Sequence, residues 1–117
     1  MKNLCDIKIR EYGSGRKDVV VLHGGPGATG YMAPVASRLG RKFHTLEPFQ
    51  RHSGTKPLTV NRHVQDLHEI IQSKCGGKAA IVGHSWGAML GLAYAADNPD
   101  SLSCLTLIGC STFDAES

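Results

Sequence analysis

Hydrophobic and polar positions along the chain form two kinds of segment, and together they predict an α/β fold. Short β-branched or alternating runs predict strands at residues 4–12, 18–22, 43–47, 79–83 and 102–108. Apolar residues at helical spacing predict helices over 32–39, 60–71 and 85–98. Strands that alternate with helices at this spacing imply right-handed crossovers and a mostly parallel sheet covered on both faces, a three-layer αβα sandwich.

Local patterns also predict where each strand lies in the sheet and where the helices end. The continuous run 18–22 predicts a strand buried on both faces at the sheet centre, whereas 4–12 alternates apolar and charged residues like an edge strand. Gly40 is expected to stop the first helix and Gly76-Gly77 to break the second, whose inner stripe is expected to include Val60. Residues 48–58 form a polar loop.

Length and composition predict one domain over residues 1–117. Hydrophobic residues make up 41% and charged residues 20%, which is typical of a soluble globular protein. No apolar run is long enough to span a bilayer, and the start of the chain does not resemble a signal peptide. We therefore expect a cytoplasmic protein with no membrane partner.

The net charge of +3 is spread along the chain. Arg38, Arg41 and Lys42 form the nearest thing to a cluster, and a solvated helix end explains them better than a nucleic-acid patch. We therefore expect no nucleic-acid partner.

The four cysteines have no metal-type spacing. Cys5, Cys75, Cys104 and Cys110 lack any C-x-x-C pair, which favours reduced, mostly buried thiols over the alternatives of a disulfide or a zinc site. We expect no metal and no cofactor.

The first chemical motif is Gly83-His84-Ser85-Trp86-Gly87, between a predicted strand and a predicted helix. Such a turn presents a serine hydroxyl at the sheet edge, and glycine is needed where strand and helix approach each other closely. The first amides of the helix would face an oxyanion formed there. The motif therefore predicts a nucleophilic Ser85, the alternative being an ordinary serine N-cap.

The second motif is His23-Gly24-Gly25-Pro26-Gly27, which follows the predicted central strand. Glycines at this edge let backbone N–H groups approach a substrate. We predict the amides of Gly25 and Trp86 as the two oxyanion donors. A phosphate-binding loop is disfavoured because neither G-x-G-x-x-G nor a G-K-[ST] ending is present, and a plain turn stays open.

With these motifs, the chain resembles the α/β-hydrolases and, among them, the proline iminopeptidase-like branch. The resemblance also rests on the Gln50-Arg51-x-Ser53-Gly54 loop and covers about residues 18 to 110. It implies Ser85 as the nucleophile and a site mouth lined by six further residues: His23, Gly24, Pro26, His84, Gln50 and Arg51. The iminopeptidase loop typically reads Asp-Gln-Arg-Gly, and here Phe49 and His52 replace the aspartate and the glycine.

The resemblance is incomplete because no histidine follows Ser85 in these 117 residues. Family members present the triad in the order serine, acid, histidine, so the chain looks like the N-terminal part of the fold, without the lid and last strands. Asp114 could approach the site, but a carboxylate alone completes no triad. The upstream histidines are expected in other roles than the base, with His23 in a packing role, His84 pointing away from Ser85, and His63 and His68 solvated on a helix. Of His44 and His52, which flank the third strand, His52 alone is placed near the mouth.

Two functions follow from the sequence. The first is a serine hydrolase acting through an acyl-enzyme on a small ester, amide, aminoacyl or peptide substrate, with the base supplied by a complementary C-terminal chain or by self-association. The second is a non-catalytic hydrolase remnant that binds a partner along the open edge of the last strand.

Overall fold

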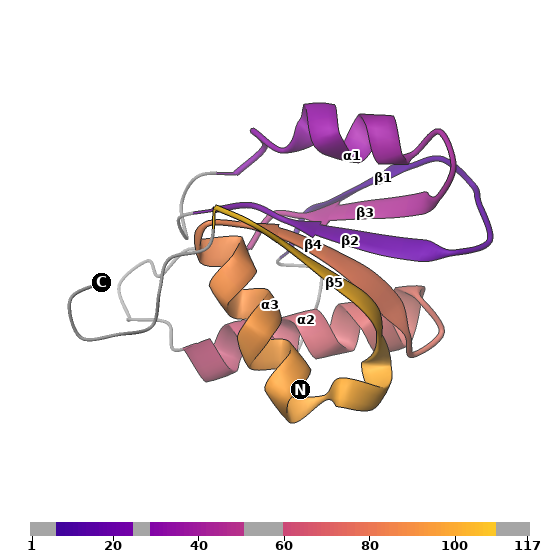
Figure 1. The fold of residues 1–117 in the computed structure, drawn as a ribbon. Helices are drawn as coiled ribbons and strands as arrows, with labels where there is room; N and C mark the ends of the chain where they lie inside the picture. The colour runs from indigo at the N-terminus through magenta and orange to yellow at the C-terminus, as the bar shows by residue number, and fades with distance from the viewer. Residues whose placement is uncertain (1–6, 25–28, 51–59, 110–117) are drawn as a thin grey trace.

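The computed structural model describes residues 7–24, 29–50 and 60–109 of the chain. Its elements alternate as the sequence predicts, and Figure 1 shows a twisted sheet between two helical layers. The elements in chain order are β1 (Ile9–Tyr12), β2 (Asp18–Leu22), α1 (Ala33–Leu39), β3 (His44–Pro48), α2 (Val60–Lys74), β4 (Ala79–His84), α3 (Trp86–Asp97), a 3₁₀ turn (Pro99–Ser101) and β5 (Leu102–Ile108).

The five strands lie in the order β1-β3-β2-β4-β5, with β2 at the centre as predicted. Only the edge strand β1 is antiparallel to its neighbour; the other three pairings are parallel. Leu22 at the end of β2 pairs with Gly83 of β4. The loops that leave these two strands therefore start side by side at the carboxyl edge of the sheet.

The two faces of the sheet pack against different helices. Val20 and Leu22 face the larger core with residues of α2 and α3, and Val19 and Val21 face a smaller core with Met32 and Ala36. In Figure 1, α1 lies on one side of the sheet and α2 and α3 lie on the other. This alternation explains why every residue of 19–22 is buried, as its continuous apolar run predicts.

One local prediction is wrong in detail, and another is confirmed. Val60 is 46% exposed, because it is the first residue of α2 and lies off the face formed by Val64, Leu67 and Ile71. Gly40 ends α1 as predicted, in a right-handed conformation with φ −63°. Its small size matters there, since a Cβ would lie 2.6 Å from the Cβ of Tyr12.

Two thiols of the described ranges are free, and they differ in exposure. Cys75 is buried in the larger core, and burial raises its pKa to about 12, which keeps it protonated and unreactive. Cys104 is exposed on β5, so the prediction of mostly buried thiols is wrong there. Cys5 and Cys110 lie outside the described residues.

Strand β5 is the other edge of the sheet. Leu107 and Ile108 near its end are 38% and 42% exposed. Arg38, Arg41 and Lys42 are exposed around the end of α1, in agreement with a solvated helix end. Within the described ranges, no helix is both long and apolar enough to cross a membrane.

Candidate active site

Ser85 lies in the abrupt turn between β4 and α3. With φ 55° and ψ −115°, it is the only residue other than glycine with a positive φ in the described part of the chain. An L-residue is strained in this conformation, and it is held here by packing and by the hydrogen bond from Ser85 N–H to Ile108 O at 3.0 Å. Ser85 occupies the N-cap position of α3, but its side chain makes no capping hydrogen bond. The geometry thus differs from the ordinary serine N-cap that was the alternative interpretation.

The glycines on either side of Ser85 are required by space. A Cβ on Gly83 would lie 2.4 Å from Gly87 O, so strand and helix touch as predicted. A Cβ on Gly87 would lie 2.4 Å from Leu22 O and 2.8 Å from His23 O. The first turn of α3 is therefore packed against the end of β2 as well as against β4, the strand that leads into α3.

The two glycine motifs meet at the carboxyl edge of the sheet. A Cβ on Gly24 would lie 3.2 Å from Ser85 Cβ and 3.1 Å from His84 O. The loop that follows β2 is therefore in contact range of the serine. Gly25, Pro26 and Arg51, which were predicted at this site, lie outside the described residues.

Tyr31 spans the mouth of the site between these two motifs. Its hydroxyl accepts a hydrogen bond from Gly24 N–H at 2.6 Å and lies 2.5 Å from His84 Nδ1. Because the amide can only donate, the hydroxyl proton is left to bond to Nδ1. Sequence reasoning missed Tyr31, and its place between the glycine-rich loop and α1 is the one signal that could have found it.

His23 is fully buried and connects the second motif to the end of β3, consistent with the packing role predicted for it. Gln50 N–H donates to His23 Nε2 at 3.0 Å, and Nδ1 lies 2.9 Å from Gly24 O. Since an amide only donates and a carbonyl only accepts, the ring is neutral with its proton on Nδ1. Gln50 also bonds to His23 O through its side-chain nitrogen and to the Trp86 indole N–H through its oxygen.

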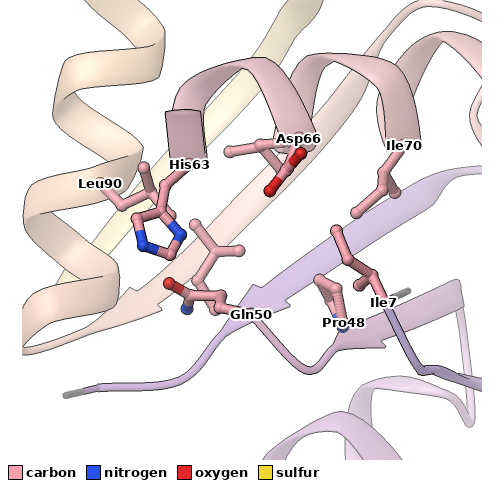
Figure 2. Close-up of a pocket in the computed structure, with 9 residues that line it drawn as sticks. Ile7, Pro48, Gln50, His63, Asp66, Ile70 and Leu90 are labelled. Carbon is pink, nitrogen blue, oxygen red and sulfur yellow. The ribbon is translucent and has the colours of Figure 1, made fainter. Parts of the chain in front are cut away.

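His63 contradicts the prediction of a solvated helix position. It is 4% exposed, and its ring packs edge-on against Trp86 with centroids 5.8 Å apart. A small cavity lies beside it, and Figure 2 shows side chains from α2 projecting into this cavity toward Gln50 and Pro48. The side chain of Trp86 is thus held between Gln50 and His63, behind the serine turn.

The other histidines lie in different surroundings. His68 is half-buried and pairs with the Tyr94 hydroxyl at 2.9 Å, so it is not simply solvated. His44 pairs with two carboxylates at the amino edge of the sheet. His52 and Asp114 lie outside the described residues. Among the described residues, no group of three or more possible ligands could hold a metal ion.

The N-terminus of α3 supplies the electrostatics of the site. Trp86 is the first residue of α3, where backbone N–H groups have no acceptor within the helix and the positive end of the dipole lies. The side chains gathered around the turn are those of histidine, tyrosine, glutamine and tryptophan, and none of these is a carboxylate. A strained serine, the N-terminal amides of a helix and Gly24 thus lie together at this edge of the sheet.

Comparison with known proteins agrees with this geometry. Residues 18–116 match the family described as the alpha/beta hydrolase fold. The chain belongs to the α/β-hydrolase family. Its sheet order and serine turn are therefore those of an α/β-hydrolase, of which this chain represents the N-terminal part of the fold.

Individual α/β-hydrolases are similar over most of this chain. A 2-(acetamidomethylene)succinate hydrolase from Mesorhizobium japonicum is 32% identical over 107 residues, which is 87% of this chain and 38% of that protein. A protein named "Putative carbamate hydrolase RutD" from Escherichia coli O44:H18 is 31% identical over 97 residues, 77% of this chain and 36% of its own length. An α/β-hydrolase structure from Sphaerobacter thermophilus is 33% identical with a TM-score of 0.75, covering 86% of this chain and 40% of that one. The chain thus spans less than two fifths of the length of these curated relatives.

Proposed function

We propose that this chain carries the nucleophile of a serine hydrolase. Ser85 Oγ attacks a substrate carbonyl carbon and passes its proton to a general base, while the carbonyl oxygen becomes an oxyanion. The amides of Trp86 and Gly25 stabilise that oxyanion. The leaving group departs with a proton, and water then releases the acyl group from Ser85. The strained Ser85 turn beside Gly24 is the observation that carries this proposal.

The general base and its carboxylate partner come, in this proposal, from residues outside these 117. The described histidines have other partners: His23 with Gln50, His84 with Tyr31, His44 with two carboxylates, and His68 with Tyr94. A serine hydroxyl is a weak nucleophile without a base in hydrogen-bond range. The relatives are more than twice as long as this chain, so a segment corresponding to their remainder is the natural source of both groups.

The substrate we propose is a small amide or carbamate, with small esters also accepted. The two curated relatives are named for hydrolysis of an acetamido compound and of a carbamate. The motifs alone favour an aminoacyl substrate of the proline iminopeptidase type. At the aspartate position of that loop, however, the Phe49 ring packs under Arg10, with 4.8 Å between guanidinium and ring centroid. Position 49 therefore offers an aromatic ring and not a carboxylate to a substrate amine, which favours the amide or carbamate.

Labelling with a fluorophosphonate tests the proposed function. The 117-residue chain and its Ser85→Ala variant are incubated with the probe alone and in a lysate of the organism that encodes the chain. We expect labelling of the chain that increases in the lysate, with the probe on Ser85 and no labelling of Ser85→Ala. Equal labelling of both proteins, or none in either condition, would overturn the assignment of Ser85 as a nucleophile.

The exposed edge of β5 favours a second function, that of a binding module without catalysis. Leu107 and Ile108 are exposed at a strand whose outer side pairs with no described strand. Such edges add strands from other chains. If this function holds, the chain self-associates in size-exclusion chromatography and the probe never reacts; a dilute monomer that reacts with the probe contradicts it.

A further inference from the structure

We infer that Gln50 is a positioning residue that sets the distance between the glycine loop after β2 and the start of α3. This inference rests on the proposed function, since those two segments carry the expected oxyanion donors. Gln50 follows β3 and is 6% exposed. It belongs to neither glycine motif, yet it bonds to residues of both.

Three hydrogen bonds fix Gln50, each 3.0 Å long. Its backbone N–H donates to His23 Nε2, its side-chain nitrogen donates to His23 O, and its side-chain oxygen accepts from Trp86 Nε1. The orientation of the amide follows from chemistry, because an indole N–H only donates and a carbonyl only accepts. Rotating the amide by half a turn would break both side-chain bonds.

These bonds connect atoms close to the proposed chemistry. His23 O belongs to the peptide that continues into Gly24, and Gly24 approaches Ser85. Trp86 supplies both the indole that Gln50 holds and the first backbone amide of α3. One planar side chain therefore links the loop on one side of the serine to the helix on the other.

Spacing of this kind matters because an oxyanion hole works only when both donors point at the same oxygen. Loss of one such donor lowers the rate about 10²- to 10³-fold, and a shift of about 1 Å costs on the order of 10²-fold. An aliphatic residue at position 50 would fill the space but leave the loop and helix unconnected. In this inference the two glycine motifs supply the oxyanion donors, and Gln50 sets the distance between the segments that carry them.

Three variants distinguish the effect of losing the two side-chain hydrogen bonds from the effects of changing side-chain volume or charge. Gln50→Leu removes both bonds, and Gln50→Glu keeps an acceptor for Trp86 but loses the donor to His23 O. Gln72→Glu makes the same charge change at an exposed position of α2. Circular dichroism melts then give the temperature below which all three variants stay folded.

Trp86 is the only tryptophan of the chain, so its indole N–H gives a single, assignable resonance. In Gln50→Leu we expect the indole N–H to exchange with solvent about fivefold faster, since a net hydrogen bond contributes about 1 kcal/mol. The Gly24 amide resonance is expected to shift as well, because that N–H belongs to the same peptide group as His23 O, which accepts from Gln50. Gln72→Glu is expected to leave both signals unchanged.

The Gln50→Glu variant adds a signature that a merely structural role would not produce. A protonated glutamic acid can donate to His23 O and accept from Trp86, as glutamine does, and burial raises the pKa of a carboxyl. The indole and Gly24 signals of Gln50→Glu are therefore expected to return toward those of the wild type from about pH 8 to about pH 5. The wild type measured at each pH is the reference for both signals.

The labelling rate of Ser85 completes the test. Gln50→Leu is expected to react with the fluorophosphonate about 10- to 10²-fold more slowly than the wild type while folded. Unchanged indole exchange and Gly24 signals in Gln50→Leu would overturn the positioning role, as would unchanged labelling in a reactive protein. If the wild type itself never reacts, the proposed function fails, and the resonance data still decide whether Gln50 holds the two segments.

Discussion

The two ends of the parallel strands hold histidines in opposite ways. At the carboxyl end, His23 and His84 bond to an amide, a carbonyl and a phenol. At the amino end, His44 lies between Asp18 at 2.6 Å and Glu11 at 2.8 Å. The hydrogen bond to Glu11, followed by that to Asp18, raises the pKa of His44, and the bond to His44 lowers the pKa of Glu11.

The amino-end histidine is therefore held by carboxylates, and the two histidines near Ser85 are not. Ion pairs at the amino end join β1, β2 and β3 at an accessible rim, where solvent weakens them. At the carboxyl end, hydrogen bonds of Gln50 and Tyr31 hold the segments around Ser85, and the positive end of the α3 dipole lies at that turn. An oxyanion formed there would meet no negative side chain among the described neighbours of the turn.

The largest effect is expected from Gly87→Ala at the carboxyl end. The new Cβ would lie 2.4 Å from Leu22 O, a backbone atom that cannot move without displacing β2. We expect a loss of more than about 4 kcal/mol in the free energy of unfolding, measured by urea titration. Gly76→Ala is the matched control, since its Cβ meets nothing within 4 Å and only φ +64° opposes it. That control should cost about 1 kcal/mol, and equal losses in the two variants would show that α3 is not pressed against β2.

Replacing His23 is expected to have the next largest effect. His23→Phe preserves the ring but leaves Gln50 N–H and Gly24 O without their partner in a buried position. We expect a loss of about 3 kcal/mol at about pH 8, from denaturant titration. A loss below about 1 kcal/mol would mean that the two groups find other partners and that the carboxyl end is less tightly organised than the bond distances indicate.

Tyr31→Phe tests the hydrogen bonds between Gly24 and His84 and is expected to reduce the free energy of unfolding less than His23→Phe does. The variant removes the hydroxyl between Gly24 N–H and His84, while the ring remains. Because Tyr31 is 44% exposed, water can replace the lost partner, and we expect a loss of about 1 kcal/mol. Faster solvent exchange of the Gly24 amide is the direct measurement, and an exchange rate equal to that of the wild type would contradict the bridge.

The order of these effects reflects what sequence could and could not predict. The turn at Ser85, the order of elements and the central place of β2 follow from local patterns, because glycine spacing and apolar periodicity act within one segment. Tyr31 and His63 acquire their roles from residues 53 and 23 positions away, Tyr31 beside His84 and His63 beside Trp86. Polarity alone placed His63 in solvent, whereas packing against α3 buries it. Such roles depend on tertiary neighbours that no local pattern specifies.

The smallest effect is expected from His44→Gln at the amino end. A raised His44 pKa stabilises the fold fully below the ordinary value of 6.5, and this contribution is lost as pH rises through the raised value. A lowered Glu11 pKa stabilises the fold above the ordinary 4.5 and ceases to do so on acidification. We therefore expect His44→Gln to lower the free energy of unfolding by about 1 kcal/mol or less. The loss should be largest between pH 4.5 and pH 6.5 and absent in alkaline buffer. A cost that grows with pH would contradict the charged pairing.

The most direct test of the central claim is a crystal structure of the chain with Ser85 phosphonylated. The account predicts that a phosphoryl oxygen accepts hydrogen bonds from the backbone amides of Trp86 and Gly25, each at about 3 Å. A phosphoryl oxygen that faces solvent with both amides bonded elsewhere, or a chain that is not phosphonylated at Ser85 even in the lysate, would contradict it.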